Sequence, residues 1–181
     1  PITPERYKRI MIVHVKGAES GMGMLMKAMG MGGGKNPAEM LKERLCEKGF
    51  DAFIYESPLD AMKKQIAAGE KPNINLYFAG KNAIDDFVSG MDLVITLCDV
   101  SSGRPSFGLS KGGGEIPWYV HELPVIVIGC GQPFVLADIP QARTYINTYD
   151  SADQTFDALI EKLMSGSDAF IGEDPVDAYC G

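Results

Sequence analysis

Three stretches of the chain are almost continuously hydrophobic and rich in β-branched residues, namely residues 10–15, 93–98 and 125–128. Strands that are apolar on both sides are typical of a parallel sheet covered on both faces. Two shorter stretches, residues 52–55 and 144–147, have a weaker form of the same character. The pattern therefore predicts five strands, the first three of them deeply buried.

Between these stretches the pattern changes to that of amphipathic helices with recognisable ends. In Asn36-Pro37-Ala38-Glu39, an N-cap residue precedes a proline at the first helical position, and a glutamate follows in capping-box spacing. A glycine is a common helix terminator because it tolerates the left-handed conformation. We predict four helices, which open at Asn36, at Ser57, before Ile84 and at Ser151-Ala152-Asp153-Gln154, and end at Gly49, Gly69, Gly90 and Gly166.

This alternation of strands and helices predicts an α/β fold. The expected architecture is a three-layer α/β/α sandwich around a mostly parallel sheet of five or six strands, with right-handed crossovers. We favour the strand order 2-1-3-4-5, which is flavodoxin-like. Residues 1–181 are predicted to form a single domain without internal repeats.

Length and charge narrow the possible functions. The 181 residues suffice for one well-buried domain, whereas a (β/α)₈ barrel of typical size needs roughly 250 residues. With 24 acidic against 17 basic residues, the net charge is −7. Such a chain has no basic footprint for nucleic acid and would be repelled by anionic membranes. We therefore expect neither nucleic acid nor a membrane among its partners.

The chain ends and the cysteines give weaker indications of the chain's origin, its metal content and its location. The chain begins at Pro1 with nothing that resembles a signal segment, and we expect it to be a fragment of a longer chain. The four cysteines show no metal-ligand spacing, so we expect free thiols, no metal site and no cofactor. Cys98 and Cys130 end hydrophobic runs and are predicted to be buried. Free thiols and the missing signal segment lean towards a cytoplasmic location.

Three segments that follow strands do not look like simple connectors: residues 21–34, 101–118 and 129–134. They should lie together at the carboxyl edge of the sheet, where open α/β sheets bind ligands. The first is rich in methionine and glycine, which fits either a mobile loop or a soft surface for a partner domain. None of the three has the spacing of a P-loop or of a dinucleotide fingerprint.

The acid–base candidates are few. His14 lies within a predicted strand and is interpreted as a buried, hydrogen-bonded core residue, and no nucleophilic triad includes His121. Glu115 and Glu122 flank Trp118, where an indole could raise a carboxyl pKa into the range of a general acid. We favour a structural reading, with Glu115 capping a short helix, because no second placed carboxylate can be identified.

The C-terminal half contains several blocks that resemble a known family. In order along the chain they are residues 111–124 (KGGGEIPWYVHELP), 133–140 (PFVLADIP), 144–149 (TYINTY) and 175–181 (PVDAYCG). Together they are similar to the C-terminal domain of family 3 glycoside hydrolases, above all to the β-N-acetylhexosaminidase branch. The resemblance covers essentially the whole chain and is densest from residue 111 onwards.

The resemblance implies a function for the chain. In that family an N-terminal (β/α)₈ barrel carries the aspartate nucleophile, and a C-terminal flavodoxin-like sandwich packs on the barrel near the sugar. In the β-N-acetylhexosaminidase branch the acid/base also lies on the barrel. The resemblance therefore implies a non-catalytic domain, inactive alone, whose partners are the barrel of the same parent chain and a carbohydrate such as an N-acetylglucosaminide.

Loops 17–35, 101–115 and 129–134 would then face the barrel and frame the sugar site. The residues expected to contact the substrate or the barrel are Arg104, Lys111, Glu115 and Gln132. Two alternatives remain open. The chain could be a free-standing flavodoxin-like module that binds a small ligand, or Glu115 could serve as the acid/base, as in the β-glucosidase branch of the family.

Overall fold

The computed structural model describes most of the sheet and the helices around it. The residues described are 1–16, 29, 35–56, 58–72, 88–100, 123–139 and 142–166. The predicted third helix is described only from Val88, which is helical, to the turn at Gly90. Its remaining predicted positions, Ile84 and Phe87, lie outside the described residues.

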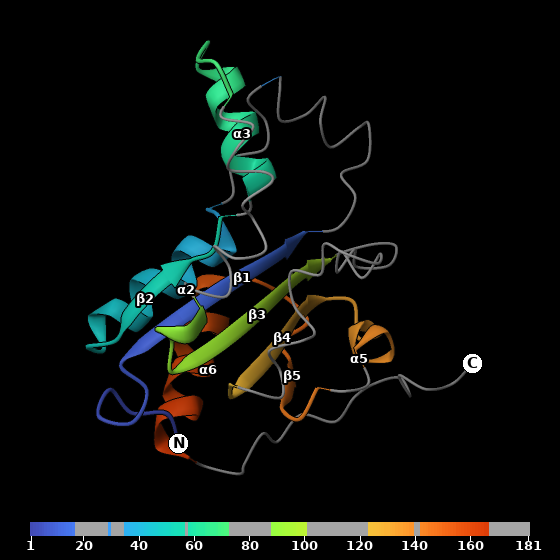
Figure 1. Ribbon diagram of the computed structural model, residues 1–181. Helices are drawn as coiled ribbons and strands as arrows, with labels where there is room; N and C mark the ends of the chain where they lie inside the picture. Colours follow the sequence, from blue (N-terminus) through green and yellow to red (C-terminus); the bar gives the residue numbers. More distant parts are fainter. Residues whose placement is uncertain are drawn as a thin grey trace.

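Five strands form one sheet in the order β2-β1-β3-β4-β5, and every neighbouring pair is parallel. Both the parallel pairing and the order 2-1-3-4-5 were predicted from the sequence, and both are confirmed. In Figure 1 the arrows of β1 and β3 run side by side in the same direction. The strands are β1 (Arg9–Lys16), β2 (Asp51–Ile54), β3 (Leu93–Val100), β4 (Val125–Gly131) and β5 (Tyr145–Asn147).

Helices lie on both sides of this sheet. Figure 1 shows α2 and α6 together behind the sheet, whereas α5 lies on the other side and α3 projects beyond β2. The one-turn helix α5 falls in the connection between β4 and β5, where the sequence pattern predicted only a loop. The helices are α2 (Pro37–Glu47), α3 (Pro58–Ala67), α5 (Val135–Asp138) and α6 (Asp153–Ser165).

Two hydrophobic cores, one on each face of the sheet, account for the layered arrangement. The first joins alternate sheet residues such as Ile12 and Ile95 to Leu41 of α2 and Phe156 of α6. The second joins the intervening sheet residues to residues near α5 and before β3. Because successive side chains of a strand point to opposite faces, both faces of β1 and β3 are buried. This is the three-layer α/β/α arrangement that the sequence predicted.

The predicted N-cap residue and first-position proline of α2 are confirmed, whereas the predicted capping box with Glu39 stays a prediction. The Asn36 side chain accepts a hydrogen bond from the Ala38 N–H at 3.0 Å, and Pro37 occupies the first helical position. These contacts satisfy one of the free N–H groups that every helix start exposes. Since the helix follows a strand of a parallel sheet, its N-terminus lies towards the carboxyl edge.

The start of α6 differs from the prediction, which placed Ser151 as the opening residue. The N-cap position is Ala152, which makes no side-chain cap. Asp150 supplies the interaction instead, because its carboxylate accepts hydrogen bonds from the Ala152 N–H and the Thr155 hydroxyl. The sequence pattern missed this because the capping carboxylate lies two residues before the N-cap position.

Replacing Asp150 by alanine is expected to lower the free energy of unfolding by about 1 kcal/mol at pH 7, the usual cost of a lost helix cap. The Thr155 hydroxyl and then the Ala152 N–H lower the pKa of Asp150. Its contribution is therefore present above pH ~4, the unfolded pKa, and is lost as the pH falls through the lower folded pKa.

Urea unfolding of the Asp150→Ala and Asp150→Asn variants at pH 7 and in acid would check this. Asn keeps an acceptor oxygen but does not titrate. It should therefore retain part of the stability and lose the contribution to acid sensitivity. An alanine variant as stable as the unmodified chain at pH 7 would contradict the capping role.

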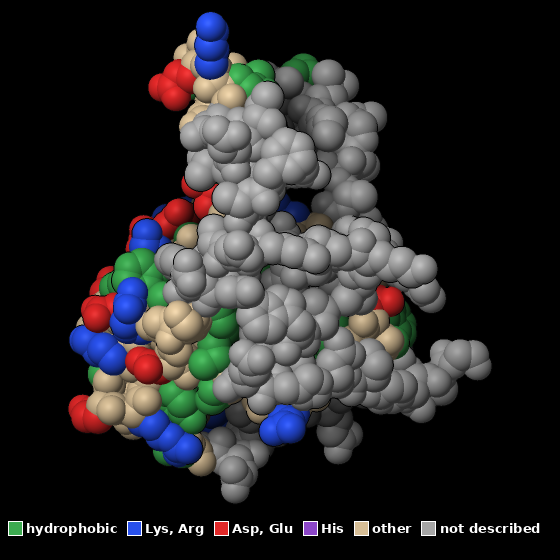
Figure 2. Space-filling model, in the orientation of Figure 1, with side chains coloured by type: hydrophobic (Ala, Val, Ile, Leu, Met, Phe, Trp, Pro, Cys, Tyr) green, Lys and Arg blue, Asp and Glu red, His purple; other side chains and the backbone are tan. Residues whose placement is uncertain are grey.

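The remaining features of the fold concern its helix hydrophobicity and its surface charge. Among the described residues, no helix is long and apolar enough to span a membrane. Figure 2 shows acidic and basic side chains interspersed over the described part of one face, with no broad patch of one sign there.

Candidate functional site

The carboxyl edge of the sheet is the candidate site. β1, β3 and β4 are parallel neighbours and end at Lys16, Val100 and Gly131, so the segments that follow them start at the same edge. After β1 the chain connects to β2 on one side, whereas β3 lies on the other side. This reversal is the switch point at which open α/β sheets form their ligand crevice.

Polar side chains line this edge in one row. The strand register pairs Lys16 with Asp99 and Asp99 with Cys130. These positions continue the alternation of Ile12 and Ile95, so they lie on the sheet face that carries α2 and α6. His14 lies one step deeper in the same alternation. We call His14, Lys16, Asp99 and Cys130 the carboxyl-edge cluster.

His14 is the buried member of the carboxyl-edge cluster. Its side chain is 7% exposed, and its Nε2 lies 3.7 Å from an Asp99 carboxylate oxygen. The His14 side chain is buried as predicted, but its Nε2 has no hydrogen-bond partner among the described residues, where the prediction had expected a hydrogen-bonded imidazole. A polar atom without a partner is costly in a buried position, which singles it out as a functional candidate. The Asp99 carboxylate and the Lys16 amine, which are more exposed, can bind the hydroxyl groups of a polar ligand beside the buried imidazole.

Cys130 is held as a neutral thiol. Burial raises its pKa to about 11, aided by the Asp99 and Asp150 carboxylates and opposed by a hydrogen bond from the Thr148 hydroxyl. The Thr148 Oγ1 lies 3.3 Å from the Cys130 sulfur. Because the thiolate is the nucleophilic form, Cys130 is unsuited to nucleophilic catalysis at neutral pH. Cys98 is also buried, as predicted, and its pKa is raised by the same cause.

At pH 8, Cys46 is expected to react with iodoacetamide at least about a hundredfold faster than Cys130 in the folded protein. Cys46 is exposed, whereas Cys130 is buried and its pKa lies near 11. Mass spectrometry of the labelled peptides over time would give both rates, with a urea-unfolded sample as the control. Equal rates in the folded protein would show that the Cys130 thiol is not held neutral and buried.

Of the predicted contact residues, Gln132 lies within the described part of the chain. It follows β4 at the carboxyl edge, and its N–H donates a 3.1 Å hydrogen bond to the Val100 carbonyl at the end of β3. The structure therefore brings Gln132 to the edge predicted for it. Arg104, Lys111 and Glu115 lie outside the described residues.

Lys16 and Asp99 were not singled out by the sequence pattern. A signal for them exists, since each is a charged residue at or near the end of a hydrophobic strand. Their alignment across β1 and β3, however, depends on the strand register. Within the described residues, no cluster of three or more side chains suits a metal ion.

No protein-family model matches the chain. A β-N-acetylglucosaminidase/β-glucosidase from Cellulomonas fimi is 28% identical over 185 residues, which cover 100% of this chain and 29% of that protein.

Solved structures give a consistent result. Beta-glucoside phosphorylase BglX has 27% identity and a TM-score of 0.64, over 100% of this chain and 28% of its own. The same phosphorylase bound to 2FGlc has 26% identity and a TM-score of 0.63, over 98% and 27% of the two chains. The chain matches the C-terminal region of family 3 glycoside hydrolases. It spans less than a third of the length of these relatives.

The match to family 3 glycoside hydrolases confirms the resemblance drawn from the sequence blocks. It also agrees with the observed layers, because the structural overlap extends over nearly the whole chain. The chain is therefore similar to one part of a larger glycosidase.

Proposed function

We propose that this chain is a single, non-catalytic domain of a family 3 glycoside hydrolase, packing on an N-terminal (β/α)₈ barrel and helping to frame its sugar site. The main support for this proposal is the extent of the match, which covers all of this chain but less than a third of the length of each relative. The remaining length of such relatives leaves room for a barrel of roughly 250 residues. The parent substrate would be a β-linked glycoside such as an N-acetylglucosaminide.

The carboxyl-edge cluster is the part of the domain best suited to that role. Lys16 is exposed and Asp99 partly exposed at the edge, so both side chains can reach a ligand or a partner surface. Gln132 leaves β4 at the same edge. In our proposal, Arg104, Lys111 and Glu115 extend this surface and contact the barrel or the sugar. These contacts would position the substrate rather than cleave it.

The chain alone is expected to show no turnover of an aryl N-acetyl-β-glucosaminide or an aryl β-glucoside. Retaining glycoside hydrolysis needs two catalytic groups about 5 Å apart across the scissile bond, and in the proposal both belong to the barrel. The assay measures aryl alcohol release by the purified chain, with the parent enzyme as the positive control. Turnover by the isolated chain that follows its concentration through purification would refute the non-catalytic role.

A second candidate concerns the group to which the parent enzyme transfers the sugar. Two of the structural neighbours are structures of one protein named a phosphorylase, which favours phosphate as the acceptor in place of water. Assaying the parent enzyme with and without inorganic phosphate separates these cases. Phosphate-dependent formation of a sugar 1-phosphate would indicate a phosphorylase, and a rate independent of phosphate, with free sugar as product, would indicate a hydrolase.

A further inference from the structure

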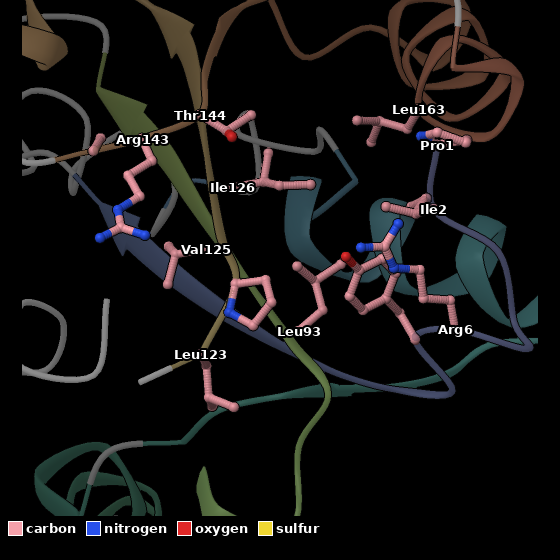
Figure 3. Close-up of a pocket in the computed structure, with 13 residues that line it drawn as sticks. Pro1, Ile2, Arg6, Leu93, Leu123, Val125, Ile126, Arg143, Thr144 and Leu163 are labelled. Carbon is pink, nitrogen blue, oxygen red and sulfur yellow. The ribbon is translucent and has the colours of Figure 1, made fainter. Parts of the chain in front are cut away.

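A cavity lies at the opposite edge of the sheet from the carboxyl-edge cluster. It has a volume of about 570 Å³ and is bordered by the starts of β3 and β4, the segments before β1 and β5, and the end of α6. Figure 3 shows these segments around it. This volume lies within the usual range of small-molecule sites, about 300–1,000 Å³.

The floor and much of the wall of the cavity are apolar. Leu93, Val125 and Ile126 line it where β3 and β4 begin, and Leu163 borders it from α6. Leu93 and Ile126 are 1% and 7% exposed, so they belong to the packed core. An apolar floor of this kind suits the hydrocarbon part of a ligand.

The charged side chains on the cavity wall are those of two arginines, Arg6 and Arg143, and Pro1, with the α-amino group, borders it as well. Figure 3 shows them on opposite sides of the cavity, with Leu93, Val125 and Ile126 between them. No Asp or Glu occurs among the described lining residues, although acidic residues outnumber basic ones in the chain. The cavity is thus locally basic in an acidic protein, which favours an anionic ligand.

Arg6 is held in place by the fold of the N-terminal segment. The Ile2 N–H donates to the Leu163 carbonyl at 2.8 Å, and the Arg6 N–H donates to the Thr3 carbonyl at 3.0 Å. The Arg6 guanidinium lies 5.1 Å from the centre of the Tyr7 ring. The two hydrogen bonds fix the backbone that carries Arg6 beside the cavity, and the Tyr7 ring is the described contact of its exposed guanidinium.

We propose that this cavity binds a small organic carboxylate with an apolar body. The hydrocarbon part would lie on the more exposed Leu123, Pro124 and Val125, above the buried Leu93 and Ile126. The carboxylate would accept hydrogen bonds from Arg6 or Arg143, whose planar guanidinium groups match carboxylate geometry. The proposal is independent of the proposed function, because the cavity and the carboxyl-edge cluster lie at opposite edges of the sheet.

Isothermal titration calorimetry of the 181-residue chain with 4-phenylbutyrate tests this site, at about 50 mM salt so that screening is weak. The matched probes are 4-phenylbutanamide, which lacks the charge, and acetate, which lacks the apolar body. We expect 4-phenylbutyrate to bind at least about tenfold more tightly than either, since each comparison removes one of the two interactions.

Substitutions of the two arginines test whether 4-phenylbutyrate binds in this cavity. Arg6→Gln and Arg143→Gln should each weaken 4-phenylbutyrate binding severalfold, and the double variant about tenfold or more. Lys8→Gln removes one positive charge from an exposed side chain outside the cavity and should leave affinity unchanged. Thermal melts of the variants verify that they are folded. No binding of 4-phenylbutyrate at millimolar concentration, equal binding of the acid and the amide, or unchanged binding by the double variant would overturn the proposal.

Discussion

Replacing Phe156 by alanine is expected to lower the free energy of unfolding by about 3–5 kcal/mol. Phe156 is 0% exposed and is among the largest fully buried side chains of the described residues. It lies in the core between the sheet and α6, so truncation leaves a cavity in the layer that holds the helix on the sheet. Few residues around it can move to fill that space, because strands and helix are both fixed by backbone hydrogen bonds.

Urea unfolding followed by circular dichroism measures this change. Phe134 provides a matched control, since the same side chain is 44% exposed there and Phe134→Ala should change stability by no more than about 0.5 kcal/mol. Phe156→Leu keeps most of the volume and should cost less than the alanine variant. A cost below about 1 kcal/mol for Phe156→Ala would show that α6 is not packed on the sheet as described.

The second large effect concerns Arg44, which joins α2 to α6. Its Nε donates to the Asp157 carboxylate at 2.6 Å, and one terminal nitrogen donates to the Asp153 carboxylate at 2.8 Å. The Arg44 side chain is only 15% exposed, although both aspartates are at least half exposed. Charge-assisted hydrogen bonds to a largely buried guanidinium contribute more to stability than ion pairs between exposed side chains.

Arg44→Met is expected to lower the free energy of unfolding by about 2 kcal/mol at pH 7. Methionine retains much of the apolar stem, so the change reports mainly on the hydrogen bonds. The Arg44 hydrogen bond lowers the pKa of Asp153. The pair therefore stabilises the fold above pH ~4 and loses this effect as the pH falls through the lower folded pKa of the aspartate.

Unfolding at pH 7 and in acid, with a double-mutant cycle that adds Asp153→Asn, measures this interaction. The difference between Arg44→Met and the unmodified chain should shrink in acid. Glu39→Gln is the control, because its partner Lys42 lies 3.6 Å away in an exposed pair on α2 alone and should contribute little. A zero coupling energy between Arg44 and Asp153 would contradict the account of the contact between α2 and α6.

Much of the fold could be predicted because its determinants are local in the sequence. Continuous hydrophobic runs mark β1, β3 and β4 as strands covered on both faces, and alternation with helices implies parallel connections. The opening of α6 was mispredicted because Ser151 fits the capping pattern, yet Asp150 makes the contacts. The short α5 gives no periodic signal, since it is one turn long.

The position of the candidate site at the carboxyl edge of the sheet could be predicted from the sequence, but the residues that form it could not. The carboxyl edge follows from the parallel order of the strands. That Asp99 lies between Lys16 and Cys130 depends on the strand register, where a shift of one residue would move a side chain to the other face. Likewise, the burial of His14 could be predicted, but not that its Nε2 would lie near Asp99 without a hydrogen bond to any described residue.

We expect this chain to act, as proposed, as a domain of a larger glycosidase that packs on a catalytic partner. The most direct test expresses this chain and the barrel region that we propose lies upstream of it as separate proteins. Analytical ultracentrifugation and an aryl glycoside assay are then applied to each protein and to their mixture. The account predicts a one-to-one complex, with full activity in the mixture and none in this chain alone. The absence of a complex, together with full activity of the upstream protein by itself, would contradict it.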